Sequence, residues 1–264
     1  IRDVERSRGL GDVYKRQIEK EEYMTFYDVD RTRVKNIIEK ARGEGRVVLL
    51  EYETKEIMRA YGIPAPVTIL AKSEDEAVKI AREIGYPVVL KICSPKIIHK
   101  TDVGGVVLNI NSDREVREAY RNIMNRVSRY FPRAKIYGVS IHKMVPKGKE
   151  VIIGVMKDLN FSHLLMFGLG GIYTNILKDF SFRIAPLSLT EARKMIQETK
   201  AYLLLKGVRG EAPSDINSVI NTIMRISQLV QDFPEIVEMD INPLFVYKEG
   251  EGCLALDVKI TLSK

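Results

Sequence analysis

Apolar residues recur along this chain at two spacings, one typical of helices and the other typical of strands. In residues 30–42 the apolar positions Val34, Ile37, Ile38 and Ala41 have helical spacing, and Asp30 stands where a cap is expected. Further helices are predicted for residues 51–61, 73–85, 111–130 and for two or three segments within 189–231. Short apolar runs predict strands at residues 67–71, 86–92, 103–110, 135–144, 150–156, 164–167, 172–176, 181–184, 237–241, 244–247 and 254–260.

The order of these elements predicts an α+β fold with two unequal subdomains. Strands and helices alternate over residues 63–130, and we expect a compact small subdomain over residues 63–143. Its first helix begins with Ser73 and Glu76, which have the spacing of a capping box. Residues 144–264 hold more strands, and we expect a larger subdomain there with a mostly antiparallel sheet. Residues 28–62 supply N-terminal helices ahead of both subdomains.

The first residues of the chain show no apolar periodicity. Residues 7–17 read SRGLGDVYKRQ and resemble the in-frame translation of a transposase-type sequencing adapter. We therefore expect residues 1–17 to be a disordered leader that lies outside the fold.

Composition narrows the classes of function without selecting one. The 264 residues carry a formal net charge of +7, from 42 basic and 35 acidic side chains that are dispersed along the chain. Without a block of like charges we expect no nucleic-acid partner, whereas phosphorylated small molecules suit this charge. No apolar run approaches the roughly 18 residues of a membrane span. The two cysteines, Cys93 and Cys253, form no metal-binding spacing, so we expect a cytoplasmic protein.

The stretch richest in candidate chemistry follows a predicted strand of β-branched residues. Residues 94–105 read SPKIIHKTDVGG, which suits neither strand nor helix, so we expect a loop at the end of a sheet. Lys91 near the end of the strand and Lys100 in the loop place two ammonium groups where they can face a polyanion. The glycine pair at the end of the loop lets backbone N–H groups approach phosphate oxygens, and His99 precedes it. The competing interpretation is a surface turn with one solvated histidine.

A glycine cluster lies in the second half of the chain, in MFGLGGIY. Its glycines, Gly168, Gly170 and Gly171, match neither the dinucleotide-binding fingerprint nor the P-loop. They suit a turn between strands whose backbone lies close to a ligand, or a tight hairpin with no ligand.

The C-terminal strands bring acidic side chains into apolar surroundings. In EMDINPL the alternation places Glu238, Asp240 and Asn242 on one strand face. Asp257 lies in LALDVKI, a second apolar strand that can pair beside the first. A few hard oxygen ligands suit Mg²⁺ completed by nucleotide phosphates, and the alternative is a polar strand face turned to solvent.

Together these stretches resemble a known family. GIPAP, GYPVVLKI, SPKIIHKTDVGGV, KEVIIG, MFGLGGI, KDFSFRIAPL, LLKGVRG and EMDINPL appear in the order found in one group of nucleotide-binding β subunits. These are the ATP-grasp subunits of ADP-forming acyl-CoA (acetyl-CoA) synthetases, relatives of succinyl-CoA synthetase. The resemblance covers about residues 31–262. It implies an ATP-grasp fold in which two α+β subdomains enclose a nucleotide cleft.

The resemblance also implies roles for individual residues. His99 matches the histidine that carries a phosphoryl group, and Arg183 would face the γ-phosphate as a second catalytic residue. ATP or ADP would be held by Lys91, Lys100, Met144, Val145, Glu150, Gly168, Gly170 and Gly171, and Mg²⁺ by Asp240, Asn242 and Asp257. The chain departs from the family where Phe161, Ser162 and His163 replace a frequent Phe-Gly-Pro, which affects the expected conformation of that turn.

A chain of this kind would convert acyl-CoA, ADP and phosphate to acid, CoA and ATP through a phosphohistidine. Because it resembles no CoA-binding fingerprint, it would need a CoA-binding α subunit in a hetero-oligomer such as α2β2. Two alternatives stay open. One is a stand-alone ATP-grasp carboxylate ligase, which would not need His99, and the other is the ATP-grasp regulatory module of a fused protein acyltransferase. Adenine and guanine nucleotides, and several acyl groups, fit this interpretation equally.

Overall fold

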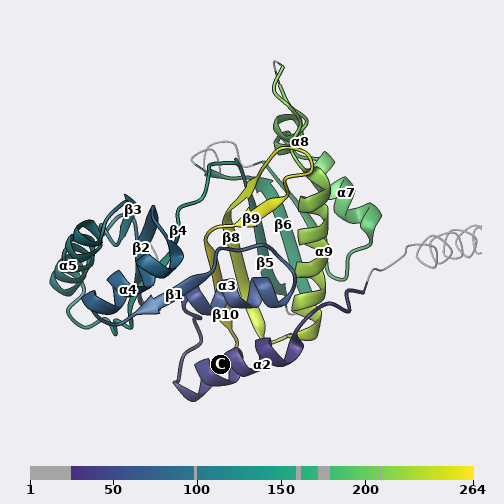
Figure 1. Ribbon diagram of the computed structural model, residues 1–264. Helices are drawn as coiled ribbons and strands as arrows, with labels where there is room; N and C mark the ends of the chain where they lie inside the picture. Colours follow the sequence, from purple (N-terminus) through teal and green to yellow (C-terminus); the bar gives the residue numbers. More distant parts are fainter. Residues whose placement is uncertain (1–24, 98–99, 159–161, 172–178, 209) are drawn as a thin grey trace, which may run out of the picture.

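The computed structural model describes residues 25–97, 100–158, 162–171, 179–208 and 210–264 of the chain (Figure 1). Four sequence-based expectations fall wholly or partly outside these residues: the leader at 1–17, the strand at 172–176, the position of His99 and the first residue of the turn at 161–163. The described residues form two sheets with helices packed against them, which confirms the predicted α+β class. No helix within these ranges is long and apolar enough to cross a membrane.

The smaller sheet has the strand order β1-β4-β2-β3. Its strands are β1 (Thr68–Ala71), β2 (Val88–Cys93), β3 (Val106–Ile110) and β4 (Gly138–Lys143), paired antiparallel. Helices α4 (Glu74–Ile84) and α5 (Asp113–Tyr130) pack with one face of this sheet and bury Leu90, Ile92 and Ile141. Because side chains alternate along a strand, Lys91 points to the opposite face.

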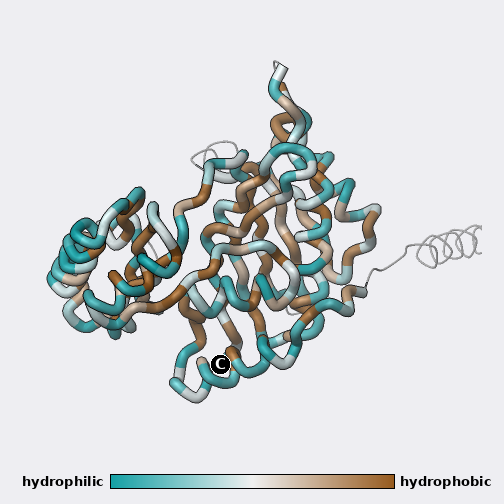
Figure 2. Tube along the Cα trace, in the orientation of Figure 1, coloured by the Kyte–Doolittle hydropathy of each residue, from teal (hydrophilic) through white to brown (hydrophobic). Residues whose placement is uncertain are grey.

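The larger sheet has the order β10-β8-β5-β6-β7, with β9 beside β8, and it is antiparallel as predicted. Its strands are β5 (Lys149–Asp158), β6 (Ser162–Leu169), β7 (Phe180–Ile184), β8 (Ile236–Val246), β9 (Cys253–Ala255) and β10 (Val258–Leu262). Helices α7 (Leu189–Gln197), α8 (Lys200–Leu205) and α9 (Ile216–Asp232) belong to the same half. Hydrophobic residues follow the strands of this sheet, whereas much of α5 is hydrophilic (Figure 2).

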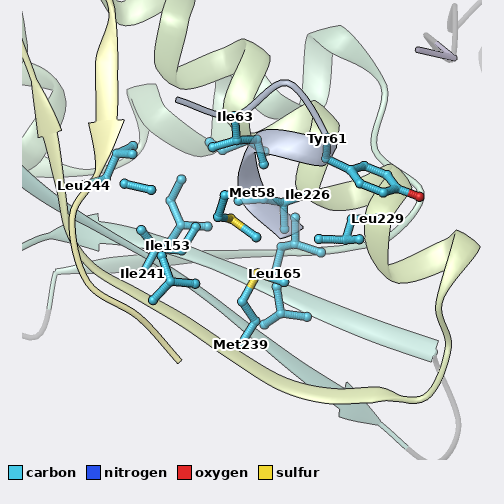
Figure 3. Close-up of a cluster of buried hydrophobic side chains, with 14 of the residues drawn as sticks. Met58, Tyr61, Ile63, Ile153, Leu165, Ile226, Leu229, Met239, Ile241 and Leu244 are labelled. Carbon is cyan, nitrogen blue, oxygen red and sulfur yellow. The ribbon is translucent and has the colours of Figure 1, made fainter. Parts of the chain in front are cut away.

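The main core lies between one face of the larger sheet and the helices packed on it. Met58 and Tyr61, from the N-terminal part of the chain, meet Leu165 and Met239 of the sheet and Leu229 of α9 (Figure 3). The N-terminal helices α2 (Arg31–Gly43) and α3 (Glu51–Ala60) therefore join this core.

Helix α3 lies between the two sheets. It contacts β1 of the smaller sheet and β10 of the larger one (Figure 1). The residue boundaries 28–62, 63–143 and 144–264 stay a prediction, but α3 contacts both halves of the chain.

Side-chain caps explain where helices begin. Asp30 Oδ1 accepts a hydrogen bond from the Arg33 N–H at 2.9 Å, as predicted for α2. At the predicted capping box, Ser73 Oγ accepts from the Glu76 N–H at 3.2 Å. The Glu76 carboxylate, however, accepts from the N–H of Lys72 at 2.7 Å, one residue earlier than a capping box requires.

The bounds of three predicted strands near the C-terminus were wrong. The expected strands at 237–241 and 244–247 are one strand, β8, and the expected strand at 254–260 is divided into β9 and β10. The Asn242 N–H donates to the Asp257 carbonyl at 3.0 Å, and the Leu256 N–H donates to the Pro243 carbonyl at 3.1 Å. These bonds hold the bend at Asp257 against β8. Pairing with a neighbouring strand, which the apolar pattern does not report, thus sets the break.

Strand β3 also starts later than predicted. It begins at Val106 and not at Val103, because the preceding residues form a turn in which Gly104 takes a φ of +63°. Glycine adopts this left-handed conformation without the cost that a Cβ imposes.

Candidate active site

A pocket of about 250 Å³ opens where the smaller sheet meets α3 and the C-terminal strands. Three segments far apart in the sequence line it: the start of α3, the end of β2 with the loop beyond it, and the strands β8 and β10. The lining residues are Val48, Leu49, Leu50, Glu51, Ile92, Cys93, Ser94, Ile97, Lys100, Asp240, Asn242, Asp257, Val258 and Lys259. Four predicted site residues, Lys100, Asp240, Asn242 and Asp257, are thus brought together.

At one wall of this pocket, Glu51 gathers three lysines. Its Oε1 lies 2.9 Å from Lys55 Nζ and 3.0 Å from Lys91 Nζ, and its Oε2 lies 3.0 Å from Lys100 Nζ. Ser140 of β4 donates its hydroxyl to the same Oε2 at 3.3 Å. The Glu51 and Lys55 side chains are 1% and 0% exposed, so the cluster is buried. The sequence pattern did not single out Glu51 or Lys55, because carboxylate–lysine pairs at i,i+4 are common on solvated helix faces.

Burial and charge oppose each other in this cluster. Burial by itself raises the pKa of the Glu51 carboxyl, but the ammonium groups of Lys91, Lys55 and Lys100 outweigh it and hold that pKa well below its usual range. For Lys55 burial prevails over the attraction of Glu51, with Lys91 adding repulsion, and lowers the pKa to about 8. For Lys100 burial is outweighed by Glu51 and Asp257, which raise the pKa above its usual value.

The three predicted metal ligands line the same pocket as Lys100, and Asp257 lies nearest to the lysines. Asp257, 45% exposed, has its Oδ1 3.9 Å from Lys91 Nζ and 3.8 Å from Lys100 Nζ. Burial, opposed by Lys259 and assisted by neighbouring carboxylates, raises the pKa of Asp240 to about 6. Glu238, which shares the strand face, does not line the pocket and instead accepts from Lys259 Nζ at 3.0 Å.

The donor set of this pocket fits Mg²⁺. Asp240 and Asp257 offer carboxylate oxygens and Asn242 offers an amide oxygen, all of them hard ligands. Among the described residues, no group of three or more His, Cys, Asp or Glu side chains is placed to hold a metal. An ion at this site would therefore complete its coordination with phosphate oxygens and water, the arrangement that Mg²⁺ usually adopts.

Of the three histidines of the chain, the structure describes two, and both are buried. His99 lies outside the described residues, but Ile97 and Lys100 on either side of it line the pocket. His142 is buried on β4, and burial, with Lys55 and Lys91 adding repulsion, lowers its pKa to about 3. His163 is buried on β6, where its Nε2 lies 2.8 Å from the Ile236 carbonyl oxygen.

The turn that departs from the family pattern keeps a backbone conformation typical of glycine. Ser162, at the position where the family often has glycine, takes a φ of +72°. The departure from the family pattern therefore leaves the conformation of this turn in place and raises its energetic cost, because serine carries a Cβ.

Two glycines of the cluster, Gly170 and Gly171, line a second pocket, whereas Gly168 does not. Gly168 lies within β6. The Gly170 N–H donates to the Glu150 carbonyl at 3.0 Å. A Cβ at Gly170 would lie 2.9 Å from the carbonyl carbons of Glu150 and Val151, which explains the glycine. The pocket, of about 410 Å³, is lined by Lys149, Glu150, Val151, Leu169, Gly170, Gly171, Ala201, Leu204 and Leu205.

The predicted adenosine contacts Met144 and Val145 lie in the segment that joins the two sheets. The Met144 N–H donates to the Pro87 carbonyl at 2.9 Å. Neither residue lines either of the two pockets.

The structure does not bring Arg183 to the predicted site. Cross-strand pairing places it in one row with Leu165, Val155 and Met239, which belong to the core. Asp240 belongs to the neighbouring row, whose side chains point to the opposite face of the sheet. The Arg183 guanidinium lies 2.6 Å from both Glu191 Oε2 and Glu198 Oε1. This placement does not support a contact with a γ-phosphate, because strand register turns the side chain toward α7.

Comparisons with known proteins agree with this geometry. A family model described as an ATP-grasp domain matches residues 40–262. The chain is 48% identical over 227 residues to the acetate–CoA ligase [ADP-forming] II subunit beta of Pyrococcus furiosus, covering 86% of this chain and 96% of that protein. It is also similar to two solved structures of Ca. Korarchaeum cryptofilum dinucleotide forming acetyl-coenzyme A synthetase 1.

The first of these, in complex with coenzyme A, Ca-AMPCP and HgCl+, is 46% identical with a TM-score of 0.83, covering 87% of this chain and 99% of that chain. The second, with coenzyme A and Mg-AMPPCP and a phosphohistidine segment pointing towards the nucleotide binding site, is 41% identical with a TM-score of 0.76, covering 87% and 100%. These matches confirm the predicted ATP-grasp fold. The chain belongs to the ATP-grasp family, among the beta subunits of the ADP-forming acetate–CoA ligases.

Proposed function

We propose that this chain is the nucleotide-binding β subunit of an ADP-forming acyl-CoA ligase that works through a phosphohistidine. The observation that carries the proposal is the pocket that unites Lys100 with Asp240, Asn242 and Asp257, while Lys91 lies 3.9 Å from Asp257. Cations that neutralise phosphate and oxygen ligands that suit Mg²⁺ come from opposite halves of the chain and meet there. Phosphoryl transfer depends mainly on this combination of positioning and charge neutralisation.

The residues that line the two pockets, and Lys91 beside the first of them, each take one task in this proposal. Lys91 and Lys100 donate their ammonium hydrogens to phosphate oxygens and offset their charge. Asp240, Asn242 and Asp257 would hold Mg²⁺, which would supply positive charge to offset that of the phosphate groups. Glu150, Gly170 and Gly171 contact the nucleoside at the second pocket, whose lining includes the aliphatic side chains of Val151, Leu169 and Leu204. An apolar wall of this kind suits a flat base.

The transfer step assigned to His99 balances without a further reactant. In the direction of ATP formation, the terminal oxygen of ADP attacks the phosphorus held on the imidazole nitrogen. The N–P bond breaks, an O–P bond forms, and a proton from water restores the neutral imidazole. A histidine suits this role because its neutral form is a competent nucleophile near pH 7.

A CoA-binding α subunit completes the enzyme in this proposal, in a hetero-oligomer such as α2β2. The relative from Pyrococcus furiosus is itself named a beta subunit, which supports a partner. A cytoplasmic location belongs to the same proposal, since Cys93 and Cys253 are both buried and free.

The test is an assay of the chain purified with and without a CoA-binding partner subunit. ATP formation from acetyl-CoA, phosphate and Mg²⁺–ADP should require both proteins. Incubation of the pair with γ-labelled ATP and Mg²⁺ should leave an acid-labile, base-stable label that is lost in His99→Ala. The label should remain in His163→Ala, whose histidine bonds a backbone carbonyl inside the fold.

Other outcomes select between the alternatives. Normal turnover of His99→Ala without a partner would indicate a stand-alone carboxylate ligase. Nucleotide binding with no turnover and no label, even with the partner present, would indicate a regulatory module.

A further inference from the structure

Glu51 occupies a position that neither the motifs nor the proposed ligand contacts explain. It is the first residue of α3, and its side chain is 1% exposed. Both carboxylate oxygens are used: Oε1 by Lys55 and Lys91, and Oε2 by Lys100 and Ser140. These partners come from α3 itself, from two strands of the smaller sheet and from the loop after β2.

The charges of this cluster do not cancel. Three ammonium groups, of Lys55, Lys91 and Lys100, share one buried carboxylate, and Asp257 approaches two of them only at 3.8 and 3.9 Å. Taking charges out of water is costly, and a surplus of one sign raises that cost. Lys91 and Lys100, which share one buried carboxylate with a third ammonium group, are suited to receive an anion such as a phosphate group. The anion would supply the missing negative charge.

Glu51 also ties the lysines to the larger sheet. Ile57 and Met58 of α3 are buried in the main core, and α3 contacts β10. Lys91 and Lys100 belong to the smaller sheet and its loop, so their distance from Asp257 depends on how that sheet is held against α3. The hydrogen bond from Lys100 Nζ to Glu51 Oε2, at 3.0 Å, supplies such a link.

We propose that Glu51 is a positioning residue for phosphoryl transfer. It holds the ammonium groups of Lys91 and Lys100 at the places where phosphate oxygens bind, and Lys55, whose Nζ lies 2.9 Å from Glu51 Oε1, fixes the orientation of the carboxylate. This inference rests on the proposed function, because it assumes that both lysines bind phosphate. Glu51 itself touches no reacting atom in this account.

A purely structural ion pair is the competing explanation, and the chain offers a matched control for it. Glu53 lies two residues further along α3 and is equally buried. It pairs with Arg46 at 2.7 Å and accepts the Leu50 N–H at 2.8 Å and the Tyr52 hydroxyl at 3.3 Å, so its partners among the described residues are not the phosphate-site lysines. Glu53→Gln therefore reports what the loss of a buried carboxylate does to the fold alone.

The experiment compares Glu51→Gln with Glu53→Gln in complex with the CoA-binding partner. For Glu51→Gln we expect phosphoryl transfer from saturating γ-labelled ATP to slow by about 10- to 100-fold, because small misplacements of binding groups cost this much. The Kd for ATP, measured by calorimetry, should change by less than about threefold, because bound phosphate replaces the lost carboxylate as the partner of both lysines. Glu53→Gln should lower Tm but leave the transfer rate at saturating ATP unchanged.

A second variant guards against loss of folding. Glu51→Gln combined with Lys55→Met removes one charge of each sign, so it should restore Tm toward the wild-type value without restoring the transfer rate. The proposal is overturned if the transfer rate recovers together with Tm, or if Glu53→Gln slows transfer as much as Glu51→Gln. Wild-type protein that binds no ATP would instead refute the proposed function, and the role of Glu51 would fall with it.

Discussion

Replacing Lys91 by methionine should weaken ATP binding while the fold survives. The Lys91 side chain is 8% exposed, and its Nζ lies 3.0 Å from Glu51 Oε1 and 3.9 Å from Asp257 Oδ1. Methionine has a similar length and no charge, so the change removes the ammonium group with little change in volume. The variant therefore separates the charge of this residue from its packing.

The expected magnitude follows from the contacts of the lysine. A hydrogen bond to a charged group contributes roughly 1.5–3 kcal/mol, so loss of one phosphate contact should raise the Kd for ATP by about 10- to 150-fold. The free energy of unfolding should hardly fall, because Glu51 keeps Lys55 and Lys100 as partners. Lys91 also lowers the pKa of Lys55 by repulsion, so its removal relieves an unfavourable interaction inside the cluster.

Calorimetric titration with ATP and Mg²⁺ measures the Kd, and thermal unfolding without nucleotide measures the stability. Lys143→Met is the matched control: it lies on β4, next to β2, and donates to the Gly85 carbonyl at 2.9 Å. Its Kd should stay within about twofold of wild type, because exposed charges contribute little. Wild-type affinity in Lys91→Met would show that the strand lysine does not bind phosphate, and the assignment would have to be withdrawn.

Three further predictions address metal, pH and backbone conformation. Asp257→Ala should abolish the Mg²⁺ dependence of ATP binding in calorimetry with Tm unchanged, because its side chain is 45% exposed; unchanged dependence would sink the metal assignment. The pKa of His142 is lowered from 6.5 to about 3, so the unfolded chain binds more protons in this window. The free energy of unfolding should therefore decrease as the pH falls from 6.5 to about 3, by up to about 1.4 kcal/mol per pH unit. Urea titrations of His142→Gln at several pH values should show a weaker dependence of this free energy on pH. Ser162→Gly should stabilise the fold by about 1 kcal/mol, because φ is +72° at this residue, and an unchanged or lower urea midpoint would contradict this.

Most helices and strands were predictable because the signals that set them act over a few residues. Asp30 caps α2 where the sequence places it, and the apolar spacing behind it forms the buried face of that helix. The motifs likewise led to Lys100, Asp240, Asn242 and Asp257, which do line one pocket. Each of these features is written in a short stretch of chain.

Tertiary structure alone decided which distant groups share a site. Glu51 and Lys55 look like a solvated i,i+4 pair in the sequence, and only the packing of α3 between the two sheets buries them against Lys91. Arg183 stands in a motif, yet its pairing with Leu165 directs it to the helix-covered face of the sheet. The bend that presents Asp257 likewise depends on hydrogen bonds to β8.

The difference between what the sequence determined and what the tertiary structure decided has a physical reason. Periodicity and caps record the conformational preferences of neighbouring residues, which the sequence by itself determines. Burial, strand register and the distance between charges depend on which elements pack together. A side chain such as Glu51 therefore acquires its charged partners, and with them its proposed role, only in the folded protein.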